Sequence, residues 1–153
     1  MKSSKKAQKA LLAPWRKTSQ GIEVFLQKRS KTAKSLPNHF GFWGGGVEKG
    51  ETPEAAMLRE LQEELTITPS NYIFVGKFEF DEVKFKYDGV VKYLWCMRVS
   101  SDFESTIDVR EGQYGKFFTR KDIDEEPMFI TQDRPVLKAL FSHIEKSQTK
   151  LQS

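Results

Sequence analysis

The chain has 153 residues and a formal net charge of +4; 38% of its residues are hydrophobic and 30% are charged. This length suits a single domain, because separate hydrophobic cores form only beyond roughly 250 residues. The balance of apolar and charged residues excludes a disordered chain and a membrane span. The single cysteine, Cys96, excludes an internal disulfide and a zinc site built mainly from cysteines.

We therefore expect one domain over residues 1–153, with flexible basic tails at 1–6 and 147–153. The apolar stretch behind the N-terminal lysines, residues 10–13, is too short for a signal sequence. A reducing cytoplasmic compartment is the expectation that follows from this and from the single cysteine.

The first half of the chain predicts two strands, a glycine-rich segment and a helix. Strands are expected at 7–15 and 22–26, where residues that favour β-structure gather on either side of a turn. Residues 42–46 follow a loop and end in three consecutive glycines. A helix is predicted over 52–65, because Thr52 is a good N-cap, the next residue is a proline, and strong helix formers follow.

The second half predicts further strands and a final amphipathic helix. In chain order these are a strand at 72–80, an alternating apolar run at Val83, Phe85 and Tyr87, a hairpin turn at Asp88, strands at 90–99 and 114–119, and a helix at 131–146. Many strands with two principal helices predict an α+β domain, in which a mixed sheet lies between helices.

Three glutamates on the first helix carry the chemical signal. At roughly 100° per residue, Glu60, Glu63 and Glu64 gather on one side of the helix, opposite the leucines. Like charges at this spacing repel, and a divalent cation removes the repulsion. Carboxylate oxygens without cysteine or histidine favour a hard ion, Mg²⁺ or Mn²⁺, and Mg²⁺ commonly keeps coordination positions open for substrate phosphates. The alternative is an ordinary solvated acidic helix face.

The spacing around these glutamates resembles the signature of the Nudix hydrolase family, of MutT type. The signature is a glycine, five residues, a glutamate, seven residues, Arg-Glu, an aliphatic residue, any residue, Glu-Glu, any residue, a glycine and an aliphatic residue. The matching positions are Gly45, Glu51, Arg59, Glu60, Leu61, Glu63, Glu64 and Ile67. The resemblance implies the family's fold, an α/β/α sandwich.

Two positions depart from the family pattern. Thr66 stands where the signature has the glycine that ends the helix, and Trp43 stands where relatives often carry proline. Threonine tolerates a positive φ poorly, so the turn after the helix is expected to differ. Neither position supplies a predicted metal ligand, and we expect activity to survive both.

The resemblance also implies roles for individual residues of the signature. Glu60, Glu63 and Glu64 resemble the metal-binding glutamates, with the backbone carbonyl of Gly44 or Gly45 as a further ligand. Glu51 and Arg59 resemble the pair that braces the glycine loop against the helix, with Gly45 supporting the same loop.

Three residues outside the signature match family positions more loosely. Glu111 resembles a glutamate on a late loop that acts as a ligand or general base, and its alternative is a solvated loop residue. Arg29 resembles an arginine on the phosphate side, and its alternative is a surface arginine at a strand end. Asp133 lies where some relatives read the base, but we favour its interpretation as the N-cap of the last helix.

The implied function is Mg²⁺-dependent hydrolysis of a diphosphate linkage in a nucleoside diphosphate derivative. The candidate catalytic residues are Glu60, Glu63 and Glu111, with Glu60 or Glu111 as the group that takes the proton from water. A nucleoside triphosphate pyrophosphohydrolase acting on substrates such as 8-oxo-dGTP is the first choice, with dinucleoside polyphosphates and nucleotide sugars as alternatives.

Two further classes remain open beside hydrolysis. An isoprenyl diphosphate isomerase shares the fold but would need a catalytic cysteine in a loop, whereas Cys96 lies in a hydrophobic strand. A non-catalytic module that binds nucleotide or RNA has mild support from the basic tails. We expect a small nucleotide as the partner, neither a membrane nor a nucleic acid, and we leave a homodimer open.

Overall fold

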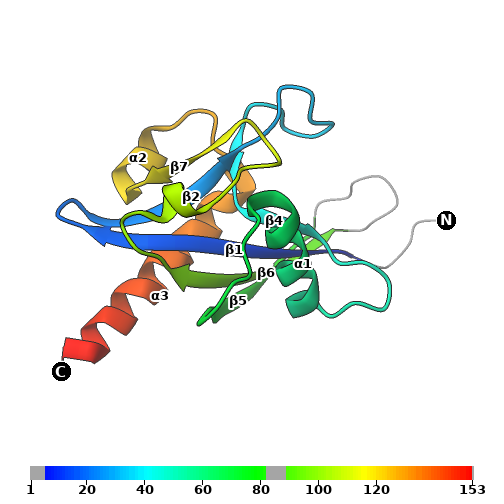
Figure 1. Ribbon diagram of the computed structural model, residues 1–153. Coiled ribbons are helices and arrows are strands. Elements are labelled where there is room, and N and C mark those ends of the chain that lie inside the picture. Colours follow the sequence, from blue (N-terminus) through cyan, green and yellow to red (C-terminus); the bar gives the residue numbers. More distant parts are fainter. Residues whose placement is uncertain (1–5, 82–88, 153) are drawn as a thin grey trace.

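One mixed sheet organises the chain in the computed structural model, which describes residues 6–81 and 89–152 (Figure 1). The predicted alternation at Val83, Phe85 and Tyr87 and the turn at Asp88 lie outside the described residues. The strands are β1 (Ala7–Thr18), β2 (Gly21–Lys28), β3 (Phe40–Gly41), β4 (Trp43–Gly46), β5 (Ile73–Phe80), β6 (Val90–Arg98) and β7 (Tyr114–Phe118).

The sheet is mixed because one central pairing is parallel. The main path runs β3-β2-β1-β6-β5, with β4 paired to β1 and β7 paired to β2. Strands β1 and β6 are parallel, and all the other pairs are antiparallel. The paired position of Ala10 on β1 is Gly45 on β4, which places the glycine segment beside the centre of the sheet.

The side chains of β1 alternate between two hydrophobic cores, one on each face of the sheet. Leu11 and Ala13 belong to the core that contains the apolar residues of α3 (Arg134–Gln152). Ala10 and Leu12 belong to the core that contains those of α1 (Pro53–Leu65). The sheet therefore lies between these helices, which confirms the predicted α+β sandwich of the Nudix type.

The first helix matches its prediction because its ends are specified locally. The Thr52 hydroxyl accepts a hydrogen bond from the Ala55 N–H at 3.1 Å, and Pro53 opens the helix. The helix face that packs on the sheet includes Ala56 and Met57, which are buried, whereas Ala55 is exposed. Glu64 lies on the buried face with Leu61 and Leu65, which brings one acidic side chain into the protein.

The second half of the chain departs from the prediction in its helices. The short helix α2 (Arg120–Glu125) was not predicted; it begins with a capping box between Thr119 and Asp122. The predicted helix at 131–146 is a 3₁₀ turn, Thr131–Asp133, followed by α3, which continues to Gln152. Another 3₁₀ turn, Phe103–Thr106, lies between β6 and β7.

Replacing Thr66 with glycine is expected to stabilise the protein by about 1 kcal/mol. Thr66 ends α1 in the left-handed region, with φ 57° and ψ 34°, and its N–H donates to the Gln62 carbonyl at 3.1 Å. A side chain in this region costs roughly 1–2 kcal/mol, and glycine avoids this cost. Glycine also gives the unfolded chain more conformational freedom, which offsets part of the gain in stability. Thermal unfolding measures the change, and we expect the midpoint to rise by about 2–4 °C. Thr68→Gly, two residues further on and without the left-handed conformation, should lower the midpoint; equal effects of the two substitutions would contradict this explanation.

Candidate active site

Two glycines of β4 bring the backbone close to α1. Gly44 has φ 127°, and a Cβ there would lie 2.1 Å from the Ala10 carbonyl oxygen, so only glycine fits. The Gly44 N–H donates to Glu64 Oε1 at 2.7 Å. A Cβ on Gly45 would lie 2.7 Å from the carboxylate carbon of Glu60. The glycines predicted from the sequence therefore make room for the two glutamates.

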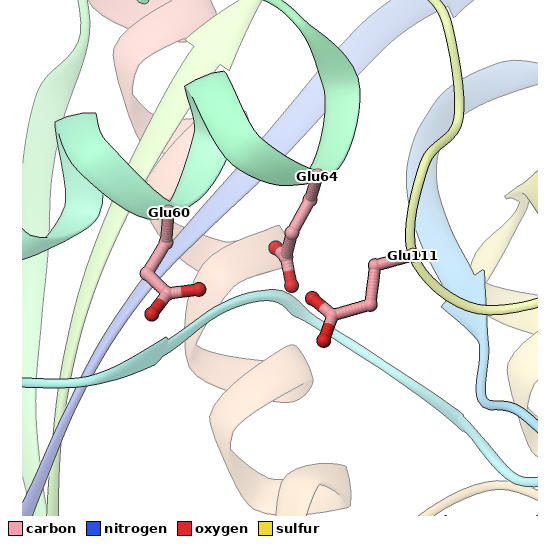
Figure 2. Close-up of side chains that lie close together, drawn as sticks. All are labelled: Glu60, Glu64 and Glu111. Atoms are coloured by element: carbon pink, nitrogen blue, oxygen red, sulfur yellow. The ribbon is translucent and has the colours of Figure 1, made fainter.

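Glu60 and Glu64 project from one side of α1 toward Glu111, which lies on the segment before β7 (Figure 2). One carboxylate oxygen from each of the three lies within 4.8 Å of one from each of the others. Residues four apart on a helix differ by only roughly 40° in direction, so Glu60 and Glu64 face the same point. The structure thus brings the predicted Glu111 together with two of the three helix glutamates.

Glu63 is not part of this group among the described residues. Its side chain is 60% exposed, and its Oε1 lies 3.6 Å from the guanidinium of Arg59. The physical reason is helical geometry, because Glu63 points roughly 100° away from Glu64. The expectation that all three helix glutamates face one point is therefore corrected, and the role of Glu63 as a ligand stays a prediction.

Arg59 braces the loop that precedes α1, as predicted. Its guanidinium holds Glu51 through two hydrogen bonds of 2.8 and 2.9 Å, and it also donates to the Gly46 carbonyl at 3.0 Å. A further bond of 2.9 Å reaches Glu60 Oε1. One planar cation thus fixes the end of β4, the loop and a candidate ligand in one arrangement.

The brace has a large effect on the Glu51 carboxyl. Hydrogen bonds from Arg59, followed by one from the Glu48 N–H, lower the pKa of Glu51 to about 2. The same bond to Glu51 raises the pKa of Arg59 further above its ordinary value. Both groups therefore stay charged across the physiological range of pH.

The pKa values of Glu60 and Glu64 are raised, in contrast to that of Glu51. Burial, together with the neighbouring Glu111, raises the pKa of Glu64 far above its ordinary value, although the Gly44 N–H opposes this. Burial also raises the pKa of Glu60, against the lowering effect of Arg59. Carboxyl groups that are buried beside one another favour protons or a cation.

The donor set fits a divalent cation. Glu60, Glu64 and Glu111 offer carboxylate oxygens only, with neither a thiolate nor an imidazole in the group. Such oxygen donors suit hard cations, including Mg²⁺, Mn²⁺ and Ca²⁺. The predicted contribution of the Gly44 carbonyl stays a prediction, because the contact that the structure records for this residue is through its N–H.

A cavity of about 420 Å³ joins the acidic group to a cationic wall. Glu60, Glu64 and Glu111 line one part of it, and the glycines of β4 form another part. Three cationic side chains also line it: Lys9 from β1, and Arg29 and Lys34 from the loop that follows β2. The structure therefore places the predicted Arg29 at the acidic site.

Lys9 and Lys34 are functional candidates that the sequence did not reveal. Lys9 lies within β1, where a strand was predicted, and it is paired with Gly46 of β4. Lys34 belongs to a loop without a recognised motif. Only the strand register of β1 with β4, which the sequence does not specify, would have pointed to Lys9.

Asp133 occupies a different environment. It is buried, and its Oδ1 accepts a hydrogen bond from Lys92 Nζ at 2.6 Å. It is not among the residues that line the acidic cavity. The ion pair with Lys92 is a structural role for Asp133 that was not considered from the sequence.

Cys96 does not serve as a nucleophile in this structure. It lies on β6 within the core that packs against α3 and is 4% exposed. Burial raises the pKa of its thiol to about 11, so the reactive thiolate is disfavoured. This counts further against the isomerase alternative.

The comparisons with known proteins agree with this fold. The NUDIX domain model matches residues 7–140. The chain is 31% identical over 118 residues to an 8-oxo-dGTP diphosphatase of Escherichia coli, covering 77% of this chain and 85% of that one. It is 28% identical over 135 residues to an RNA pyrophosphohydrolase of a Nitratiruptor species, covering 82% and 83%. A mutT/nudix family protein from Listeria innocua matches with a TM-score of 0.76 at 20% identity, covering 96% and 99%.

The chain belongs to the Nudix family. Within it, the chain is a Nudix hydrolase of MutT type. None of the helices in the described part of the chain has the length and apolar character needed to cross a membrane.

Proposed function

We propose that this protein hydrolyses a phosphoanhydride bond in a nucleoside diphosphate derivative, with Mg²⁺ as its cation. The observation that carries the proposal is the cavity in which three converging carboxylates lie with three cationic side chains. The carboxylates suit a hard cation, and the cationic side chains suit phosphate oxygens. Mn²⁺ has the same ligand preference and is expected to substitute for Mg²⁺.

Glu60, Glu64 and Glu111 would hold the cation, with the Gly44 carbonyl as a further ligand. A divalent cation held there would neutralise charge on phosphate oxygens and would make a bound water more acidic. Arg29, Lys9 and Lys34 bind phosphate oxygens and hold the chain of phosphates in line. Water then forms a bond to one phosphorus, the anhydride bond breaks, and the leaving phosphate departs with the bonding electron pair.

Glu111 is our choice for the group that accepts the proton from the attacking water. Glu60 accepts a hydrogen bond from Arg59, and Glu64 is buried and accepts one from Gly44. Glu111 is exposed within the cavity, where a water molecule can reach it.

A nucleoside triphosphate is the proposed substrate class, with 8-oxo-dGTP as the first candidate. The relative named 8-oxo-dGTP diphosphatase favours this choice, and the relative named RNA pyrophosphohydrolase favours RNA with a 5′-triphosphate as the second candidate. We further propose that residues 1–153 form one domain that acts in the cytoplasm.

A substrate panel tests the proposal with purified full-length protein and Mg²⁺. The panel contains 8-oxo-dGTP, dGTP, ATP, a dinucleoside tetraphosphate, a nucleotide sugar and a 5′-triphosphorylated RNA, and reaction in ¹⁸O-water identifies the phosphorus attacked. We expect turnover of a triphosphate, a loss of at least about 100-fold in Glu60→Gln, and a smaller loss of about tenfold in the exposed Glu63→Gln. Nucleotide binding without turnover of any member would support the binding module and overturn the proposal.

A further inference from the structure

We infer that Gln113 is a positioning residue whose side-chain amide fastens the loop at 29–39 to the segment that carries Glu111. The inference rests on the proposed function, because it concerns how the phosphate side of the cavity is held. Gln113 lies outside the family signature and is not one of the residues that line the cavity.

The loop at 29–39 forms one wall of the cavity. It leaves the end of β2 and returns to β3, and the Arg29 N–H donates to the His39 carbonyl at 2.8 Å, which closes the base of the loop. Arg29 and Lys34, two of the three cavity cations, belong to it. The position of this loop therefore sets where phosphate oxygens would meet positive charge.

Gln113 contacts both ends of this loop. Its Nε2 donates to the Arg29 carbonyl at 2.8 Å and to the side-chain Oδ1 of Asn38 at 2.8 Å. Its backbone N–H donates to the Lys28 carbonyl at 2.8 Å. Asn38 lies in the left-handed region with φ 63°, and its side-chain oxygen accepts the hydrogen bond from Gln113.

The segment that carries Gln113 also lines the cavity, through Glu111 and Gly112. Glu111 is two residues earlier, and its carbonyl accepts a hydrogen bond from Nε2 of the buried Gln27 at 3.1 Å. Gly112, with φ 84°, passes so close to β2 that a Cβ would lie 2.7 Å from the Lys28 carbonyl oxygen. These contacts fix the segment at 111–113 to β2. The side-chain amide of Gln113 in turn holds the loop at 29–39 against this segment.

Loss of the Gln113 amide should affect substrate binding and cation binding differently. Two of the proposed cation ligands, Glu60 and Glu64, lie on α1 and have no hydrogen bond to Gln113 in the described structure. Loss of the Gln113 amide should therefore release the phosphate-binding wall while leaving most of the cation site in place. A residue with only a structural role would lower stability without changing KM.

The test compares Gln113→Met, which keeps the length of the side chain but removes the donor, with the wild-type enzyme. For the best triphosphate of the panel we expect KM to rise about tenfold, kcat to change less than threefold, and the affinity for Mn²⁺ by calorimetry to stay the same. Gln20→Met, at an exposed turn between β1 and β2, is the matched control and should behave as wild type.

The partner residue gives an independent check. Asn38→Gly keeps the left-handed backbone and removes the acceptor, so it should raise KM in the same direction. In the double variant the two effects should not add, because Gln113→Met already removes the hydrogen bond to Asn38. Limited digestion with trypsin, which cleaves after Lys31 and Lys34, should be faster in Gln113→Met than in Gln20→Met.

Each failure has a distinct meaning. Unchanged KM and unchanged trypsin cleavage in Gln113→Met, in an active enzyme, overturn the positioning role and leave the hydrolase proposal intact. Additive effects of Gln113→Met and Asn38→Gly also overturn it. A wild-type protein without turnover of any nucleotide overturns the proposed function, and the trypsin comparison still shows whether Gln113 holds the loop.

Discussion

Glu64→Gln is expected to lose turnover by at least about 100-fold and yet to unfold less readily than the wild-type protein when no divalent cation is present. Glutamine has the same shape and can still accept the hydrogen bond from the Gly44 N–H, while its amide can donate to Glu111. The substitution removes a carboxyl group that is only 2% exposed and lies beside two other carboxyl groups. We therefore expect a gain of about 1–3 kcal/mol in the free energy of unfolding at pH 7.

The gain should depend on pH in a defined direction. The pKa of Glu64 in the folded protein is raised above the ordinary 4.5, so above about pH 4.5 the unfolded chain releases a proton that the folded protein retains. The stability of the wild-type protein therefore falls as pH rises through neutrality, whereas the glutamine variant lacks this dependence. Chemical unfolding from pH 4 to pH 8, in EDTA, measures the difference, which should vanish near pH 4.

Glu63→Gln is the matched control, because it alters an exposed neighbour on the same helix. It should change stability by less than about 0.5 kcal/mol. Addition of Mg²⁺ should narrow the gap between wild type and Glu64→Gln, since a cation stabilises only a site that binds it. A Glu64→Gln protein that is active, or that is less stable than wild type at pH 8, would contradict the buried acid as a cation ligand.

Gly45→Ala should cost about 100-fold in kcat with little loss of stability. A Cβ at this position would lie 2.7 Å from the carboxylate carbon of Glu60 and 2.8 Å from both of its oxygens. The carboxylate is the end of a flexible side chain, so it can move aside at small cost in folding. The movement takes Glu60 away from Glu64 and Glu111 and disrupts the ligand set.

Gly46→Ala provides the control, because a Cβ there has no atom within 4 Å. It should keep turnover and cation affinity near those of wild type. Calorimetric titration with Mn²⁺ and steady-state kinetics on the same samples measure both quantities. If Gly45→Ala binds the cation as wild type does, the close approach of Glu60 to β4 is not needed for the site.

The sequence predicted α1 and its glutamates well because the signals there are local. Thr52 and Pro53 specify the start of the helix, and the glycine spacing specifies the segment before it. The orientation of the helix was harder to predict, because the sequence alone does not specify which side of the helix faces the sheet. Glu64 therefore emerged as buried and Glu63 as exposed only in the structure.

The parts that the sequence missed depend on contacts between distant residues. Lys9 joins the site through the pairing of β1 with β4, and the Lys92–Asp133 ion pair joins residues 41 positions apart. The short helix α2 had a local signal in the capping box of Thr119 and Asp122, but its six residues are too few for an apolar period to be recognised.

The ion pair between Arg59 and Glu51 persists to a lower pH than the negative charge of the proposed cation ligand Glu64 does. The pKa of Glu51 is about 2, so this pair is lost only in strong acid, whereas Glu64 takes up a proton well above that. Acid that protonates the cation ligands should therefore release a bound metal while the loop and helix stay joined. Neutralisation in the presence of another ion would then reload the enzyme without refolding it, which gives a preparative route to metal exchange.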